Sequence, residues 1–91
     1  MYTAVITQYT PSILKGKAPR VDTQVVELHY SGLYPNPSDI KAVNPKTQVV
    51  ESLCNLDRSE IAEMLLNGQT SKIVKTSYDS MTASTSYSLF S

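Results

Sequence analysis

The chain has 91 residues, of which 41% are hydrophobic, and its eight basic side chains are balanced by eight acidic ones. A chain of this length has room for one hydrophobic core, so we expect a single domain over residues 1–91. Strong non-specific binding to nucleic acid is disfavoured because there is no surplus of Lys and Arg to displace phosphate counterions. Neutral charge also leaves little repulsion between copies, which favours homo-oligomers.

A single cysteine, Cys54, indicates a reducing compartment, since small secreted domains normally rely on an even set of disulfide-bonded cysteines. Residues 1–20 lack the charged start, long apolar run and cleavage site of a signal peptide. No stretch approaches the length of apolar sequence that spans a bilayer. We therefore expect a soluble, cytoplasmic protein that has no membrane partner.

The N-terminal third predicts two β-strands. Residues 2–9 are rich in Tyr, Thr, Val and Ile, which favour a pleated, half-buried surface. Residues 21–30 place Val26, Leu28 and Tyr30 on one face of a second strand, and Glu27 and His29 on the other. The connector 12–20 and the segment 31–38 contain Gly and Pro, which interrupt strands.

Residues 39–44 and 47–53 predict a hairpin that turns on Asn44-Pro45-Lys46-Thr47. Pro45 suits the second position of a type I turn because its φ is already fixed at the required value, and Asn44 suits the first position. A short helix that begins after Ser38 is the alternative for the start of this segment.

A helix is predicted over residues 58–67. Asp57 and Glu60 have the spacing of a capping box, and Asn67-Gly68 supplies a left-handed residue of the kind that ends many helices. Apolar residues follow helical spacing: Ile61, Met64 and Leu65, with Ala62 and Leu66 beside them.

The remaining sequence predicts a strand over 71–78, a turn at 79–80 and a closing strand over 81–90. The last strand alternates regularly, with Met81, Ala83, Thr85, Tyr87 and Leu89 on one face and Ser or Thr on the other. The fold class is therefore α+β, an antiparallel sheet of about five or six strands with one short helix packed on one face.

Catalytic or metal-binding chemistry is not predicted. His29 and Cys54 are the only residues of their types, and nothing in their spacing favours a nucleophilic Cys-His pair. We expect Cys54 to behave as a small hydrophobe and His29 to lie on the sheet surface. One His and one Cys do not make a zinc site, so we expect no metal, no cofactor and no enzymatic activity.

Asp57, Glu60 and Glu63 form an acidic ridge on the predicted helix. We interpret the ridge as a solvated face whose charges suit the positive end of the helix dipole. The alternative is a surface that binds a hard cation or imitates a row of phosphates.

Two groups of residues are candidates for binding. Lys15, Lys17 and Arg20 form a compact basic loop around Gly16, which would allow an anion to approach the backbone closely. Tyr30 and Tyr34 flank the Gly/Pro segment, and tyrosine is common on recognition surfaces. A solvated turn and ordinary strand packing are the respective alternatives.

The stretch ITQYTPSILKGKAPRV combines a strand, a proline, a Lys-Gly loop and a second strand. It resembles some short phage-encoded proteins of unknown role, over about a fifth of the chain. The resemblance implies a viral or mobile-element origin, and with it an accessory protein that blocks or sequesters a host component.

We therefore expect a small non-enzymatic interaction module that binds a protein partner or itself. The alternative is a protein that binds nucleic acid or an anionic small molecule such as a nucleotide at the basic 15–20 loop.

Overall fold

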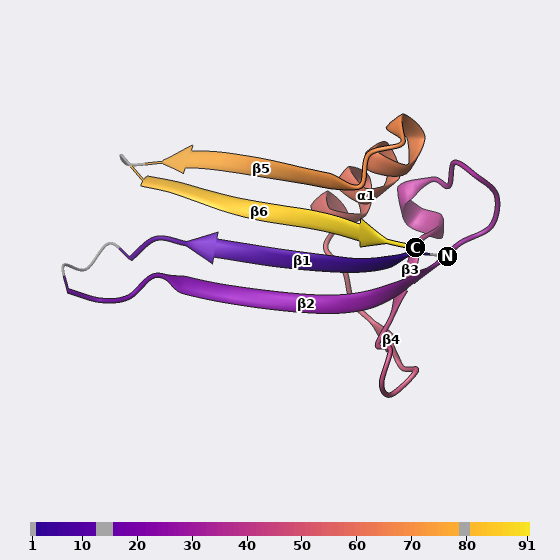
Figure 1. Cartoon of the computed structure of the whole chain (residues 1–91), viewed down its shortest axis with the longest axis horizontal. Helices are drawn as coiled ribbons and strands as arrows, with labels where there is room; N and C mark the ends of the chain where they lie inside the picture. The colour runs from indigo at the N-terminus through magenta and orange to yellow at the C-terminus, as the bar shows by residue number, and fades with distance from the viewer. Residues whose placement is uncertain (1, 13–15, 79–80) are drawn as a thin grey trace.

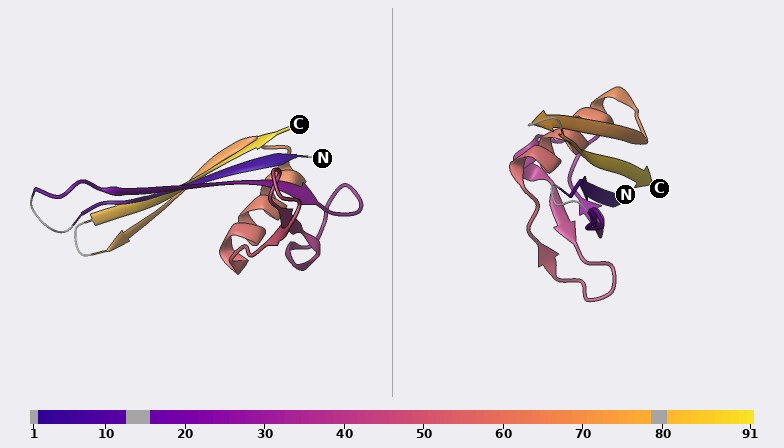
Figure 2. Two further views of the ribbon diagram at one scale, coloured as in Figure 1. Left: turned by 90° about the horizontal axis from the view of Figure 1, so that it is seen from below. Right: turned by 90° about the vertical axis from the view of Figure 1, so that its left-hand side faces the viewer.

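The computed structural model describes residues 2–12, 16–78 and 81–91. The elements are β1 (Thr3–Thr10), β2 (Arg20–His29), the 3-10 turn η1 (Pro37–Asp39), β3 (Lys41–Val43), β4 (Val50–Glu51), α1 (Asn55–Asn67), β5 (Ser71–Tyr78) and β6 (Met81–Phe90). The six strands form one antiparallel sheet in the order β4-β3-β2-β1-β6-β5, and α1 packs on one face of it (Figures 1 and 2). This confirms the predicted α+β class. The predicted turn at 79–80 lies outside the described residues.

β1 lies at the centre of the sheet, hydrogen-bonded to β2 on one side and to β6 on the other. Its pairing with β2 runs from Thr3 opposite Glu27 to Thr10 opposite Arg20, so the two strands form one long hairpin. β5 and β6 form a second long hairpin beside it. Both hairpins extend in the same direction, away from the end of the molecule that carries both chain termini (Figure 1).

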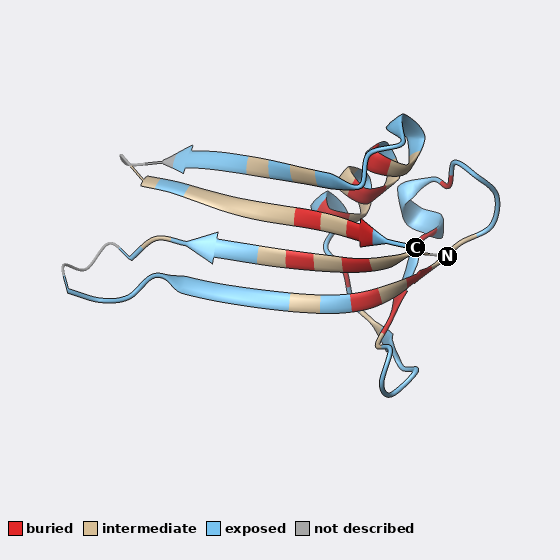
Figure 3. Cartoon of the chain, in the orientation of Figure 1, coloured by how far each residue is buried: buried red, intermediate tan, exposed pale blue. Residues whose placement is uncertain are grey.

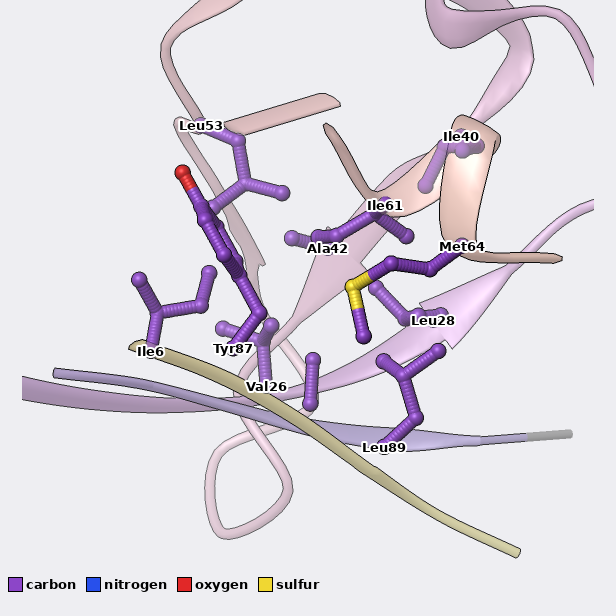
Figure 4. Packing of buried hydrophobic residues seen from close by; sticks show 11 residues of the cluster. Ile6, Val26, Leu28, Ile40, Ala42, Leu53, Ile61, Met64, Tyr87 and Leu89 are labelled. Carbon is purple, nitrogen blue, oxygen red and sulfur yellow. The ribbon is translucent and has the colours of Figure 1, made fainter. Parts of the chain in front are cut away.

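The hydrophobic core occupies one end of the sheet (Figure 3). It consists of Ala4, Ile6, Val26, Leu28, Ile40, Ala42, Leu53, Ile61, Met64, Tyr87 and Leu89, most of which Figure 4 shows in contact range of one another. The helix has 13 residues, about 20 Å of length, whereas the ten-residue strands β2 and β6 span about 33 Å. One helix therefore covers only part of the sheet.

We name the part of the sheet beyond the last row of buried residues the arm: residues 7–10 and 20–23 of the first hairpin with 73–78 and 81–86 of the second. Val74, at its inner end, packs partly against the core. No described residue of the arm is buried, in contrast to the row of residues next to it, which contains Ile6 and Tyr87. The arm makes the molecule long, with a radius of gyration of 14.4 Å against about 12 Å for a compact chain of this length.

The helix begins three residues earlier than predicted. Cys54 is the N-cap, because its Sγ accepts a hydrogen bond from the backbone N–H of Asp57 at 3.4 Å. The predicted capping role of Asp57 is therefore wrong, and Asp57 is instead buried against the sheet. The predicted end is confirmed: Gly68 has φ 67° and its N–H donates to the carbonyl of Met64. Among the described helices, none has the length and apolar character to cross a membrane.

The predicted hairpin after Ile40 is present but has short strands, β3 and β4. Its loop is one residue longer than a β-turn, since the N–H of Gln48 donates to the carbonyl of Asn44 at 2.8 Å. The side chain of Asn44 fixes the turn by accepting from the N–H of Lys46. The helix considered after Ser38 is reduced to the single 3-10 turn η1.

Candidate functional site

The two faces of the sheet differ in what covers them. α1 and η1 lie on one side, and no described helix covers the other side, which we name the open face (Figure 2). Because side chains alternate along a strand, the open face contains the residues next to the buried ones. It comprises Thr3, Val5, Thr7 and Tyr9 of β1, Val21, Thr23, Val25, Glu27 and His29 of β2, Lys41 and Val43 of β3, Val50 of β4, Ser71, Ile73, Lys75 and Ser77 of β5, and Thr82, Ser84, Ser86, Ser88 and Phe90 of β6. Of these residues, Val43 is the one that is buried.

Exposed apolar side chains gather on the open face. Eleven large hydrophobic side chains are exposed in the described parts of the chain, and six of them lie here: Tyr9, Val21, Val25, Val50, Ile73 and Phe90. Most of the other residues of this face are Ser or Thr, and the only charged side chains on its described strands, apart from His29, are Glu27, Lys41 and Lys75. The open face is therefore an apolar and hydroxyl surface with little charge.

The edges of the sheet are less suited to association than its face. β4 is one edge and has two residues, which offers little backbone for another strand to pair with. β5 is the other edge and carries Lys72 and Lys75, and lysines on an edge strand discourage pairing with another chain. The side chain of Lys72 also contacts the helix, because its Nζ lies 2.6 Å from Oε2 of Glu60.

The residues predicted to bind ligands lie at opposite ends of the molecule. Lys17 and Arg20 are exposed at the tip of the first hairpin, and Lys15 lies outside the described residues. Tyr30 follows the other end of β2, about 30 Å from Arg20 along the strand. The structure therefore does not bring the basic loop and Tyr30 or Tyr34 into one site.

The basic tip is partly neutralised by its own strand. Nε of Arg20 lies 2.8 Å from Oδ2 of Asp22, and both side chains are exposed. Gly16 has φ 85°, a left-handed conformation that favours glycine, so the loop depends on this residue for its turn.

Tyr30 lines a depression of about 450 Å³ together with His29, Ser31, Asp39 and Lys41. Burial raises the pKa of Tyr30, and the nearby Tyr2 raises it further. Ligand pockets are generally lined by apolar side chains with a few converging polar groups, whereas all five residues named here have polar side chains and three of them are exposed. Tyr34 is exposed and lines a smaller groove of about 320 Å³ between residues 34–37 and Leu66 of α1.

The acidic ridge is a solvated face only at Glu63, which corrects the interpretation for Asp57 and Glu60. Asp57 is buried and accepts a hydrogen bond from the hydroxyl of Tyr87. Glu60 and Glu63 both pair with Lys72, with Nζ to Oε2 distances of 2.6 and 3.4 Å. The hydrogen bond to Glu60 raises the pKa of Lys72. The ridge therefore attaches the helix to β5 and β6.

Cys54 is exposed, contrary to the expectation that it packs as a small hydrophobe. Its position at the start of α1 explains the exposure, since an N-cap lies outside the helix where the chain turns. His29 is half-buried on β2. No three His, Cys, Asp or Glu side chains in the described parts of the chain are grouped to hold a metal ion.

The open face contains the residues that the sequence reasoning missed, above all Val25 and Ile73. The available signal was the pairs Val25-Val26 and Ile73-Val74, where two apolar residues are adjacent in a strand. Adjacent residues point to opposite faces, so such a pair places an apolar side chain on both sides of the sheet. The chain matches no family model, no curated protein and no solved structure.

Proposed function

We propose that this chain is a non-enzymatic interaction module that binds protein through the open face of its sheet. The observation that carries the proposal is the concentration of exposed apolar side chains on this one uncovered face. Exposed apolar side chains that gather on one surface mark interaction sites more often than those that are scattered singly.

The arm supports the same proposal. A sheet is stabilised when at least one face buries apolar surface, yet no described residue of the arm is buried. Tyr9, Val21 and Ile73 lie on the open face of the arm and remain exposed. A protein bound to this face would bury them and supply the stabilisation that the isolated arm lacks.

The alternative function is binding of nucleic acid or an anionic small molecule at the basic tip. The structure supports this alternative less well than protein binding. Arg20 already pairs with Asp22, so the tip offers few free cations. Tyr30 lies at the far end of β2 and cannot stack on a base that is bound at the tip. The two functions differ in salt dependence, because affinity for a phosphate backbone falls steeply as salt increases.

We further propose that the module acts in the cytoplasm. Its thiol at Cys54 is exposed, and an oxidising compartment would join such thiols in disulfides between chains. A viral or mobile-element origin would make the bound protein a host component that the module blocks.

The test compares two matched substitutions. Ile73 on the open face is 62% exposed and Leu66 on the outer side of α1 is 61% exposed, so Ile73→Lys and Leu66→Lys add the same charge at equally exposed sites. We expect the wild-type protein and Leu66→Lys to migrate in assemblies larger than the 10.0 kDa chain when cell extracts are separated by size, and Ile73→Lys to migrate as a smaller species. Migration of all three proteins as monomers, or loss of assembly only in Leu66→Lys, would contradict the proposal.

A further inference from the structure

We infer that the protein bound at the open face is a second copy of this chain, so that two sheets pack face to face as a β-sandwich. The inference rests on the proposed function and names its partner. Four independent features of the described residues support a second copy: exposed area, strand pattern, hydroxyl pairing and charge.

The exposed area matches what one partner in a dimer buries. The chain exposes 6193 Å², whereas a compact monomer of 10.0 kDa exposes about 5,200 Å². The excess is roughly 900–1,000 Å² on that scale, and each partner in a standard protein interface buries about 800 Å². Covering the open face with one more chain would therefore return this molecule to the ordinary ratio of surface to mass.

Apolar residues occur on both faces of the long strands, although β6 keeps Thr82, Ser84, Ser86 and Ser88 on the open face. Strands that are buried on both faces have consecutive apolar residues, whereas strands with one wet face alternate. Each of the four long strands contains at least one adjacent apolar pair: Val5-Ile6 in β1, Val25-Val26 in β2, Ile73-Val74 in β5 and Leu89-Phe90 in β6. One residue of every pair lies on the open face, where only an additional layer of protein would bury it.

Four hydroxyl groups of the open face lie in two pairs across neighbouring strands. The Oγ1 atoms of Thr7 and Thr23 lie 3.5 Å apart across β1 and β2, and Oγ of Ser77 lies 3.3 Å from Oγ1 of Thr82 across β5 and β6. A hydroxyl that keeps its hydrogen bond can be buried at low cost, whereas one that loses water without a partner cannot. Burial of these four hydroxyl groups in an interface would therefore cost less than burial of unpaired ones.

The charges permit contact between identical faces. The middle of the open face, around Thr7, Thr23 and Ser86, is uncharged. Glu27 and Lys41 lie towards one end of the face, and Lys75 lies on the edge strand β5, two residues from Ile73. The chain as a whole has eight positive and eight negative side chains, so two copies do not repel each other. A two-fold contact presents the same patch on both chains, which suits a face whose centre is uncharged.

The closing experiment measures the mass of the purified protein by light scattering after size exclusion, at about 1 and 100 µM, a range that spans weak and standard interfaces. We expect a mass twice that of the 10.0 kDa chain. Because the contact is two-fold, Ile73→Lys places two lysines in the interface, and we expect it to raise the dimer Kd roughly 100-fold. Leu66→Lys should leave the Kd unchanged. Far-UV circular dichroism of each variant verifies the fold, and Val21→Lys, exposed on β2 of the same face, replaces Ile73→Lys if the latter does not fold.

The outcomes separate this inference from the proposed function. A wild-type monomer at the higher concentration, or a dimer that Leu66→Lys weakens as much as Ile73→Lys, overturns the second copy as the partner. If the purified protein is a monomer but still forms assemblies in extract that Ile73→Lys removes, the proposed function holds and the partner is a different protein. If neither purified protein nor extract contains an assembly sensitive to Ile73→Lys, both proposals are wrong.

Discussion

The phenolic hydroxyl of Tyr87 donates a 2.5 Å hydrogen bond to Oδ1 of Asp57, and this bond attaches β6 to the first turn of α1. Both side chains are buried, and Asp57 is the only charged residue buried in the described parts of the chain. The carboxylate also lies near the positive end of the helix dipole, which suits its charge. Burial raises the pKa of Tyr87, and the hydrogen bond to Asp57 raises it further.

Replacement of Tyr87 by Phe should destabilise the fold. Tyr87→Phe preserves most of the buried ring but leaves the carboxylate of Asp57 without its partner, a loss that typically costs about 1–3 kcal/mol. The free energy of unfolding from urea denaturation measures the change. Asp57→Asn in the Tyr87→Phe background removes the unpaired charge and should recover part of the loss. Equal stability of Tyr87→Phe and the wild-type protein would show that the bond contributes nothing.

The same pair predicts a loss of stability in alkali. The pKa of Tyr87 is higher in the folded chain than its ordinary value of 10.0, so above about pH 10 the unfolded chain releases a proton that the folded chain retains. The stability is therefore fully present below that pH and decreases as the pH rises. One proton accounts for about 1.4 kcal/mol per pH unit.

Urea midpoints at about pH 8 and pH 11 measure this effect. Lys72, whose pKa is raised above 10.5 by its hydrogen bond to Glu60, contributes in the same direction. Tyr87→Phe should consequently lose less stability between the two pH values than the wild-type protein, but not become independent of pH. A Tyr87→Phe variant with the wild-type pH dependence would contradict the assignment.

Because Cys54 is the N-cap of α1, we expect its serine and alanine variants to differ in stability. Sulfur accepts hydrogen bonds weakly, and serine is among the best N-cap residues, whereas alanine at such a position costs about 0.5–2 kcal/mol relative to serine. We expect Cys54→Ser to be at least as stable as the wild-type protein and Cys54→Ala to be less stable. Thermal denaturation under reducing conditions ranks the three proteins. If Cys54→Ala is as stable as Cys54→Ser, the Sγ contact with the N–H of Asp57 does not act as a cap.

Two neighbouring valines should respond differently to truncation. Val26 is fully buried beneath α1, so Val26→Ala should cost about 1.5–3 kcal/mol, whereas Val25→Ala on the open face should cost less than about 0.5 kcal/mol in a monomer. Both substitutions are made in the Ile73→Lys background, which removes the proposed dimer contact. Equal costs in urea denaturation would mean that the open face is covered within a single chain. In the wild-type background, Val25→Ala should weaken the dimer.

The parts of the fold that depend on residues close together in the sequence were predicted well. The alternation from Met81 to Leu89 predicted β6 at its observed bounds, and Gly68 predicted the end of α1, because both signals act within a few residues. The start of α1 was misassigned because Cys54 is not among the usual N-cap residues, whereas Asp57 and Glu60 have the spacing of a capping box by coincidence.

The candidate site was harder to predict because it depends on how much of the sheet the helix covers. A period-two pattern identifies the two faces of a strand, but it does not show how far along the strand the helix packs. The alternation of β6 continues through Met81 and Ala83, which are only half-buried because α1 does not extend over the arm. The basic loop and Tyr30 were both noted from composition, and only the length of β2 shows that they are far apart.

The position of β1 between β2 and β6 has a consequence for how the chain folds during synthesis. β1 pairs with β6, with Thr3 opposite Phe90, so the central ladder cannot close until β6 has left the ribosome. Until then the β1–β2 hairpin has an unpaired edge along β1, and Asp57 lacks the hydroxyl of Tyr87. Strands this distant in sequence pair slowly, because the chain between them loses conformational entropy before any contact between them forms. The folding rate should therefore be limited by docking of the β5–β6 hairpin. Until that hairpin docks, the nascent chain exposes the edge of β1, which can pair with a strand of another chain.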